Sequence, residues 1–221
     1  MAKLTQAVPD NARTLWILSP VYFDVESYLL LRDNLEREVA TTPFAQTTTF
    51  VVVDDSGGTD PRIRELRQQS NTLVVEPPFS LGHQRALVFG LRTLAGRMRD
   101  SDVVVTMDAD GEDQPTDLLR LIDPLIGDPD NLRKSALALR TRRQESPVFR
   151  VLYLIFKLFF RLTTGTLIRS GNYVAYRGWF ARKLLFHPHF DLCYSSSVVS
   201  FQLPVERVPC ERGRRYAGTS R

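Results

Sequence analysis

Cysteine is scarce in this sequence, and only Cys193 and Cys210 occur among its 221 residues. Their spacing matches no metal-ligand pattern and implies no disulfide framework, so a reducing compartment is compatible with the chain. The first residues lack the apolar stretch of a secretory signal, and no internal repeat is evident. The hydrophobic content of 43% and the charged content of 24% exclude a disordered chain and are typical of a globular domain.

Several motifs of well-known ligand sites are also missing. The sequence has no Walker-type glycine loop and no G-x-G-x-x-G pattern, which disfavours P-loop and dinucleotide-binding folds. It has no G-x-S-x-G elbow, so a serine hydrolase of that type is not supported. An EF-hand loop counted from Asp108 would need Gly at its sixth position and Glu at its twelfth, where Asp113 and Leu119 stand.

A dense acidic cluster follows an apolar run that ends at Met107. Its carboxylates are Asp108, Asp110, Glu112 and Asp113. Two carboxylates 4 Å apart repel each other by roughly 4 kcal/mol at an effective dielectric of 20, so a buried strand that ends in them is unstable without a cation. Oxygen-only ligands favour Mg, Mn or Ca. The cluster therefore predicts a divalent metal site, with a solvated acidic turn as the alternative.

Short β-branched runs alternate with helical patterns over the first 140 residues. We expect strands at 14–19, 48–53, 72–75, 103–107 and 136–139, and helices at 25–40, 61–69, 83–98 and 116–126. This alternation predicts an α/β fold with a mostly parallel central sheet flanked by helices. Ligands of such sheets bind at the carboxyl ends of the strands, where residues 20–22, residues 54–58 and the acidic cluster stand.

The second half is basic and contains a distinctive apolar segment. The net charge is only +4, but arginine is concentrated in this half, which favours phosphates, a lipid surface or nucleic acid as partners. Residues 147–164 predict an amphipathic helix with a narrow stripe of Arg150, Lys157 and Arg161. Its charge-free runs are far below the ~18 residues of a membrane span. We expect it to lie in a membrane interface, with a core-packing helix as the alternative.

Five short motifs occur in an order that resembles a known family. They are 20–22 (PVY), 53–56 (VDDS), 81–86 (LGHQRA), 107–110 (MDAD) and 212–220 (RGRRYAGTS). Together they look like the family 2 glycosyltransferases of the GT-A (Rossmann-like) fold. The branch that they resemble contains dolichyl-phosphate mannosyltransferases and bacterial polyprenyl-phosphate glycosyltransferases. The resemblance extends from about Leu15 to Arg221.

The resemblance implies roles for individual residues. It implies nucleotide-sugar contacts for Pro20, Tyr22, Asp24, Asp54, Asp55, Gly82, Arg85, Asp108 and Arg140, with Asp54 and Asp55 as alternatives for one position. It implies a D-x-D metal site for Mg²⁺ or Mn²⁺ at Asp108 and Asp110, with Glu112 where relatives often carry a metal-contacting Gln. It implies that Arg215 and Arg221 approach phosphate groups, and Arg142 and Arg212 are further basic candidates to hold an acceptor phosphate. Asp108, Asp110, Asp113 and Arg215 are then the candidate catalytic residues.

The acceptor decides whether a base is needed. A hydroxyl acceptor requires a general base, for which Asp113 is the candidate, whereas a phosphate acceptor is already anionic and needs cations instead. Residues 171–173 (GNY) stand where lipid-phosphate members often have Gly-Asp-Phe-Arg, and this departure leaves the acceptor open. We expect His83 to be a helix-entry residue rather than a base.

The sequence thus predicts a single domain, with a donor- and metal-binding half (1–140) and an acceptor- and membrane-facing half (141–221). We expect a metal-dependent transfer of sugar from a nucleotide-diphosphate sugar to a polyprenyl-phosphate-type acceptor at the cytoplasmic, inner face of the membrane, without nucleic acid as a partner. A hydroxyl acceptor and an inactive relative that binds nucleotide-sugar or membrane are the alternatives. Relatives in this branch often continue into transmembrane helices, so we also expect that this chain is a shortened form.

Overall fold

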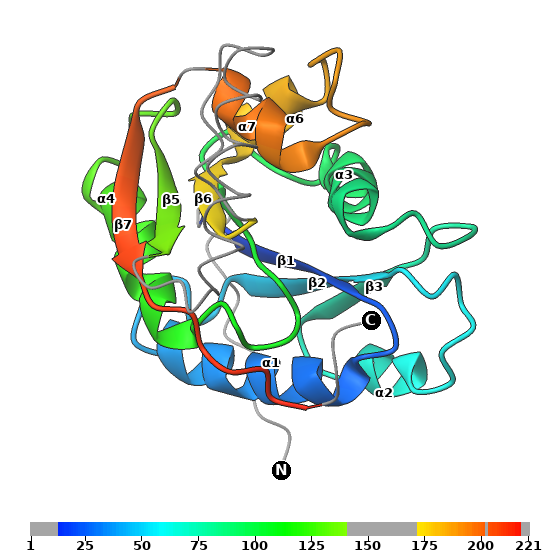
Figure 1. Cartoon of the computed structure of the whole chain (residues 1–221). Coiled ribbons are helices and arrows are strands. Elements are labelled where there is room, and N and C mark those ends of the chain that lie inside the picture. The colour runs from blue at the N-terminus through cyan, green and yellow to red at the C-terminus, as the bar shows by residue number, and fades with distance from the viewer. Residues whose placement is uncertain (1–12, 141–171, 202, 218–221) are drawn as a thin grey trace, which may run out of the picture.

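The alternating pattern of the sequence produces one mixed sheet, which a computed structural model shows in Figure 1. The structure describes residues 13–140, 172–201 and 203–217. The strands are β1 (Leu15–Val21), β2 (Thr48–Asp54), β3 (Thr72–Val75), β4 (Val103–Thr106), β5 (Ser135–Arg140), β6 (Val174–Arg177) and β7 (Val205–Cys210). The helices are α1 (Val25–Val39), α2 (Ile63–Arg67), α3 (His83–Leu94), η1 (Pro115–Asp117), α4 (Leu118–Gly127), α6 (Gly178–Leu184) and α7 (Tyr194–Ser200).

The described strands form a seven-stranded sheet in the order β3-β2-β1-β4-β6-β5-β7. Strands β1, β2, β3 and β4 are mutually parallel, and β5 is parallel to β7. Strand β6 runs antiparallel to both of its neighbours, β4 and β5. The prediction of an α/β fold with a mostly parallel sheet is therefore confirmed.

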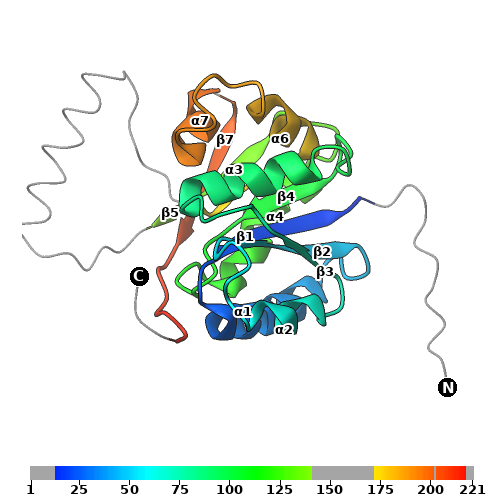
Figure 2. The same cartoon turned by 90° about the vertical axis from the view of Figure 1, so that its right-hand side faces the viewer.

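Helices cover both faces of the sheet because successive side chains of each strand point to opposite faces. On β1, Leu15 and Ile17 pack into the core beneath α1, α2 and α4, whereas Trp16 and Leu18 pack into the core beneath α3, α6 and α7. Figure 2 shows the two helical layers on either side of the strands. Strands buried on both faces have nearly continuous apolar sequences, as the three valines at the start of β4 show.

The expected elements of the first half are present with small shifts at their ends. The strand expected at 136–139 is β5, and the helix expected at 116–126 is α4, preceded by the short turn η1. The helix expected at 83–98 ends at Leu94, two residues before Gly96, which is a poor helix former. Helices α6 and α7 and strands β6 and β7 were not expected. The helix expected at 147–164 lies outside the described residues.

The chain after β7 returns to the acidic cluster and to α1. The amide of Gly213 donates to the carbonyl of Glu112 at 2.8 Å, and the amide of Tyr216 donates to the carbonyl of Asp110 at 2.9 Å. The hydroxyl of Ser27 on α1 donates to the carbonyl of Ala217 at 3.2 Å. In Figure 1 this segment runs beside α1. Residues 212–217 of the C-terminal basic motif are thereby brought to the carboxyl ends of β1 and β4.

Candidate active site

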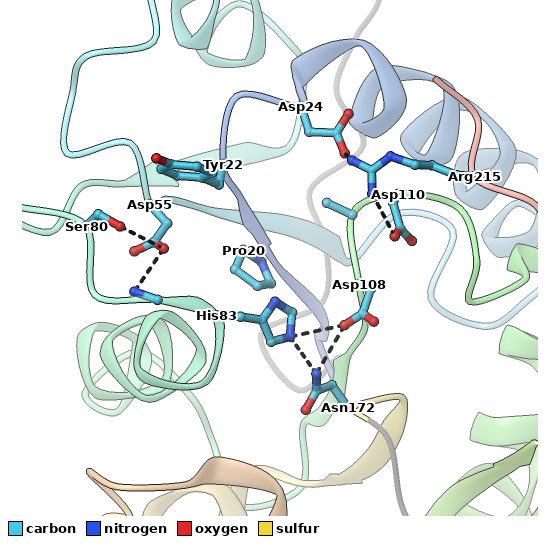
Figure 3. A pocket seen from close by; sticks show the side chains of 12 residues that line it. Pro20, Tyr22, Asp24, Asp55, Ser80, His83, Asp108, Asp110, Asn172 and Arg215 are labelled. Atoms are coloured by element: carbon cyan, nitrogen blue, oxygen red, sulfur yellow. Dashed lines mark hydrogen bonds and ion pairs between the residues drawn. The ribbon is translucent and has the colours of Figure 1, made fainter. Parts of the chain in front are cut away.

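A pocket of about 410 Å³ opens at the carboxyl ends of the parallel strands. Its lining comes from the end of β1 and the segment after it, the segments after β2 and β4, the loop before α3 with the first residue of α3, the segment before β6 and the segment after β7. The lining residues are Pro20, Tyr22, Asp24, Asp55, Ser80, Gly82, His83, Asp108, Ala109, Asp110, Asn172 and Arg215 (Figure 3). Its size lies in the range of small-molecule sites.

One end of the pocket is formed by Asp55 and the loop before α3. The carboxylate of Asp55 accepts hydrogen bonds from the amides of Leu81 at 2.7 Å and Gly82 at 3.0 Å. The hydroxyl of Ser80 lies 3.4 Å from the same carboxylate. Tyr22 is about half exposed and lines the same pocket. An exposed aromatic ring beside a fixed carboxylate suits a flat, hydrogen-bonding group.

The neighbouring Asp54 has a different environment. Its side chain is fully buried, and its Oδ1 accepts from the amide of Ser56 at 3.0 Å and from the hydroxyl of Ser56 at 2.5 Å. Asp54 is not among the residues that line the pocket. Of the two carboxylates that the sequence left as alternatives, the structure brings only Asp55 to the pocket, and Asp54 closes the turn after β2.

The acidic cluster folds into a tight loop that separates its carboxylates. Asp108 and Asp110 line the pocket, and their side chains are 22% and 17% exposed. Asp113 is buried beneath them, and its Oδ2 accepts from the amide of Asp108 at 3.1 Å. Gly111 has a φ of +84°, and a Cβ there would lie 2.5 Å from the ring of Tyr216. The loop therefore needs glycine at this position.

Two arginines of the C-terminal segment form ion pairs with carboxylates of this loop. Arg215 forms an ion pair with Asp24 and another with Asp110, whose Oδ2 lies 3.1 Å from Nη1 of Arg215. Arg212 pairs with Glu112. Glu112 is not among the residues that line the pocket. Its carboxylate contacts the guanidinium of Arg212 instead. Figure 3 shows Arg215 between Asp24 and Asp110.

His83 and Asn172 complete the site, although the sequence did not single them out as binding residues. His83 does begin α3, but its Nε2 also lies 3.1 Å from Oδ1 of Asp108. Asn172 lies before β6, and its Nδ2 is 3.2 Å from the same oxygen of Asp108. Figure 3 shows the three side chains converging. No local motif signals these contacts, because they depend on how α3 and β6 are placed beside β4.

The clustered charges change the acidity of two pocket residues. Burial raises the pKa of Asp110, and the negative charges of Asp108 and Glu112 raise it further, while Arg215 opposes them. Burial by itself lowers the pKa of His83, but the hydrogen bond and the negative charge of Asp108 outweigh it, so the pKa is raised. The raised pKa of His83 indicates negative charge at the end of β4, whereas the raised pKa of Asp110 comes mainly from its burial.

The chain's sequence matches the family model described as "Glycosyl transferase family 2" over residues 20–183. This match spans well over half of the chain and includes every pocket residue except Arg215. The chain belongs to glycosyl transferase family 2. No curated protein matches its sequence significantly.

Solved structures share the fold of this glycosyltransferase at low sequence identity. A crystal structure of 4-diphosphocytidyl-2C-methyl-D-erythritol synthase has a TM-score of 0.61 and 12% identity, covering 93% of this chain and 94% of that chain. Glucosyl-3-phosphoglycerate synthase from Mycobacterium tuberculosis, in complex with Mn²⁺, UDP and glucosyl-3-phosphoglycerate, has a TM-score of 0.55 and 16% identity, covering 93% and 73%. A mycobacterial protein has a TM-score of 0.56 and 18% identity, covering 92% and 69%. These likenesses show the fold.

The donor set of the glycosyltransferase pocket is compatible with a hard divalent cation. Within the described residues, no three His, Cys, Asp or Glu side chains converge so that they could hold a metal ion by themselves. Mg²⁺ does not need such a cage, since one or two carboxylates plus substrate phosphates usually bind it. Asp108 and Asp110 supply two carboxylates to one pocket, and their negative charge raises the pKa of His83 beside them. The residues present therefore fit Mg²⁺ or Mn²⁺.

Other residues named from the sequence lie away from the pocket or outside the described residues. Arg85 is exposed on α3 and does not line the pocket, and Arg140 ends β5. Arg142, Arg221 and the segment 147–164 lie outside the described residues. Among the helices that the structure describes, none has the length and apolar character needed to cross a membrane.

Proposed function

We propose that this glycosyltransferase takes its sugar from a nucleotide-diphosphate sugar bound in the pocket together with Mg²⁺ or Mn²⁺. The observation that carries the proposal is the convergence of Asp108, Asp110 and Arg215 at one end of a single pocket whose other end holds Tyr22 and Asp55. A diphosphate suits the first end because it binds both divalent cations and guanidinium groups. The UDP and Mn²⁺ in the complex of glucosyl-3-phosphoglycerate synthase support this arrangement.

Each end of the pocket has its own task in this proposal. Tyr22 offers a ring face to the base, and Asp55 holds the loop at Gly82 that borders it. Asp108 and Asp110 would hold the cation, which when bound neutralises the diphosphate and makes it a better leaving group. Arg215 is placed to exchange a carboxylate partner for a phosphate oxygen, because a guanidinium binds both groups with the same bidentate geometry.

For the acceptor we propose a polyprenyl-phosphate-type lipid at the cytoplasmic, inner face of the membrane. An anionic acceptor needs no base, which agrees with the burial of Asp113 beneath Asp108. Residues 141–221 would face the acceptor, with the basic apolar segment 147–164 at the membrane surface. Residues 1–140 would hold the donor and the metal.

A hydroxyl acceptor is the second candidate, and the segment before β6 favours it. Tyr173 is buried and donates its hydroxyl to the carbonyl of Gln114 at 3.2 Å. The described part of this segment therefore presents only the neutral amide of Asn172 to the pocket. Relatives that act on lipid phosphates often carry charged groups here, so the neutral amide is more easily matched with an uncharged acceptor.

A thermal-shift panel of UDP-, GDP- and dTDP-sugars, with and without Mn²⁺ or Mg²⁺, tests the donor site. We expect a metal-dependent rise in Tm for one nucleotide, lost in Asp110→Ala. Binding that needs no metal, or that survives Asp110→Ala unchanged, would overturn the assignment. With the donor known, transfer to polyprenyl phosphate in detergent is compared with transfer to a panel of hydroxyl acceptors. Transfer to hydroxyl acceptors alone would refute the lipid acceptor.

A further inference from the structure

The side chain of Asn172 stands at the junction of three elements around Asp108. Its Nδ2 lies 3.2 Å from Oδ1 of Asp108 and 2.5 Å from Nε2 of His83. An amide nitrogen only donates hydrogen bonds, so Oδ1 of Asp108 is the acceptor that Asn172 shares with Nε2–H of His83. Asn172 is thus a neutral side-chain donor that directly contacts one of the two pocket carboxylates after β4.

The orientation of this amide is determined by a chain of groups that leads to α7. The backbone amide of Ser195 lies 3.0 Å from Oε1 of Gln84, and a backbone N–H can only donate. The side-chain oxygen of Gln84 must therefore face Ser195, and its Nε2 then donates to Oδ1 of Asn172 at 2.8 Å. The Ser195 hydroxyl also lies 2.7 Å from Oδ1 of Asn172. With its oxygen engaged on this side, Asn172 turns its nitrogen to Asp108.

The main chain of Asn172 is anchored as firmly as its side chain. The hydroxyl of Thr106 on β4 donates to the carbonyl of Asn172 at 2.6 Å. The same hydroxyl lies 2.8 Å from the hydroxyl of Tyr194, which lies 3.0 Å from that of Tyr176. Both tyrosines are fully buried. Contacts with β4, β6 and α7 therefore fix the main chain of Asn172 independently of its contact with Asp108.

We infer that Asn172 is a positioning residue that holds the carboxylate of Asp108 in one orientation, and that Gln84 and Ser195 hold Asn172. The inference rests on the proposed function, because Asp108 matters there as a cation ligand. Groups that hydrogen-bond a metal-ligating side chain set its orientation, and their loss typically weakens metal binding by about 10–100-fold. Ser195 does not line the pocket, but through Gln84 and Asn172 the first turn of α7 influences the carboxylate of Asp108.

The first test follows the amide itself and needs no ligand. The side-chain NH₂ resonances of Asn172 in ¹⁵N-labelled protein are assigned by their disappearance in Asn172→Ser. We expect them to shift in Ser195→Ala, in Gln84→Met and in Asp108→Asn. Ser196→Ala is the matched control, because the Ser196 hydroxyl bonds the carbonyl of Cys193 at 3.1 Å and is not part of the chain to Asn172. Unchanged chemical shifts of the Asn172 side chain in Ser195→Ala or in Asp108→Asn would overturn the inference.

The second test measures the consequence for the cation, using Mn²⁺ alone and the electron paramagnetic resonance signal of the free ion. We expect the Kd for Mn²⁺ to rise about tenfold or more in Asn172→Ser and Gln84→Met, and to stay at the wild-type value in Ser196→Ala. Ser195→Ala, a milder change, should shift the Kd in the same direction. Wild-type affinity in Asn172→Ser and Gln84→Met, both folded by their Tm, would show that the amide serves the fold only.

The two tests separate this inference from the proposed function. If the wild-type protein binds Mn²⁺ neither alone nor together with a nucleotide-diphosphate sugar, the metal-dependent function fails, while the resonances of Asn172 still decide whether its amide holds Asp108. If the wild-type protein binds Mn²⁺ through Asp108 and the Asn172 and Gln84 variants bind it equally well, the proposed function stands and the positioning role is refuted.

Discussion

Arg215 lies 105 positions after Asp110 in the chain, yet its Nη1 is 3.1 Å from Oδ2 of Asp110. The same guanidinium pairs with Asp24, so one cation from the C-terminal segment bridges the segments that follow β1 and β4. The other oxygen of Asp110 accepts from the amide of Glu112 at 3.0 Å. Both oxygens of Asp110 therefore have partners within the protein, and the positive charge of Arg215 competes with that of a metal ion for this carboxylate.

This competition predicts opposite effects of Arg215→Ala on metal binding and on catalysis. Without the guanidinium, Mn²⁺ alone should bind more tightly, by up to about tenfold or about 1.4 kcal/mol. Sugar transfer should fall by about 10²–10³-fold, since a donor that stabilises the departing diphosphate is lost. Mn²⁺ titration and steady-state kinetics measure the two effects.

The control for this variant is Arg207→Ala on β7, where an exposed arginine is removed without touching the pocket. It should leave both the Mn²⁺ affinity and the transfer rate unchanged. An Arg215→Ala protein with wild-type Mn²⁺ affinity would contradict the competition, and one with wild-type transfer would contradict the role at the diphosphate.

The sequence predicted the first half of the fold well because that half obeys local rules. Each apolar run of residues 14–139 is separated from the next by a helical pattern, so period and turn residues are enough to place β1 to β5. Strand β6 and helices α6 and α7 could not be placed in this way. The run Val174–Arg177 is only four residues long, and its pairing with β4 depends on chain contacts about 70 positions apart. Short elements carry little periodic signal.

The site residues were likewise predictable only where they follow from local sequence rules. Residues at the ends of β1, β2 and β4 were predicted to gather because carboxyl ends of parallel strands share one edge. The choice between Asp54 and Asp55 could not be made, since it depends on which side chain the turn after β2 directs to the loop before α3. The contacts of His83 and Asn172 with Asp108 depend on tertiary packing and have no counterpart in spacing.

Gly111→Ala should loosen the C-terminal segment. Alanine at a φ of +84° costs about 1–2 kcal/mol, and its Cβ would collide with the ring of Tyr216. We expect a lower Tm and faster proteolysis after β7, together with weaker nucleotide binding, because Arg215 follows the displaced segment. Limited proteolysis with mass spectrometry locates the cut. Gly127→Ala is the control, since a Cβ there meets nothing within 4 Å. Equal proteolysis of both variants would refute the prediction.

Cys210 should make the folded protein less stable as the solution becomes alkaline. Burial, aided by the charge and hydrogen bond of Asp117, raises the pKa of Cys210 to about 12. The unfolded thiol loses its proton near pH 8.5, so the unfolded state binds fewer protons and stability falls as pH rises from there towards 12. Urea denaturation at pH 8.0 and 9.0 measures the loss, because unfolded tyrosines, with a pKa of about 10, stay largely protonated at these two pH values. The free energy of unfolding of Cys210→Ala should fall less between these two pH values. An equal fall in the variant and the wild-type protein would contradict this account.

Asp55→Asn should weaken donor binding more than it slows the chemical step. The carboxylate of Asp55 accepts from the amides of both Leu81 and Gly82, and an asparagine would present its NH₂ group to one of them. One lost hydrogen bond with a facing donor costs about 1–3 kcal/mol, so KM for the nucleotide sugar should rise about tenfold or more with kcat little changed. Asp54→Asn is the matched comparison, because Oδ1 can still accept from Ser56. It should leave KM unchanged, and a raised KM in that variant would reverse the assignment of the two carboxylates.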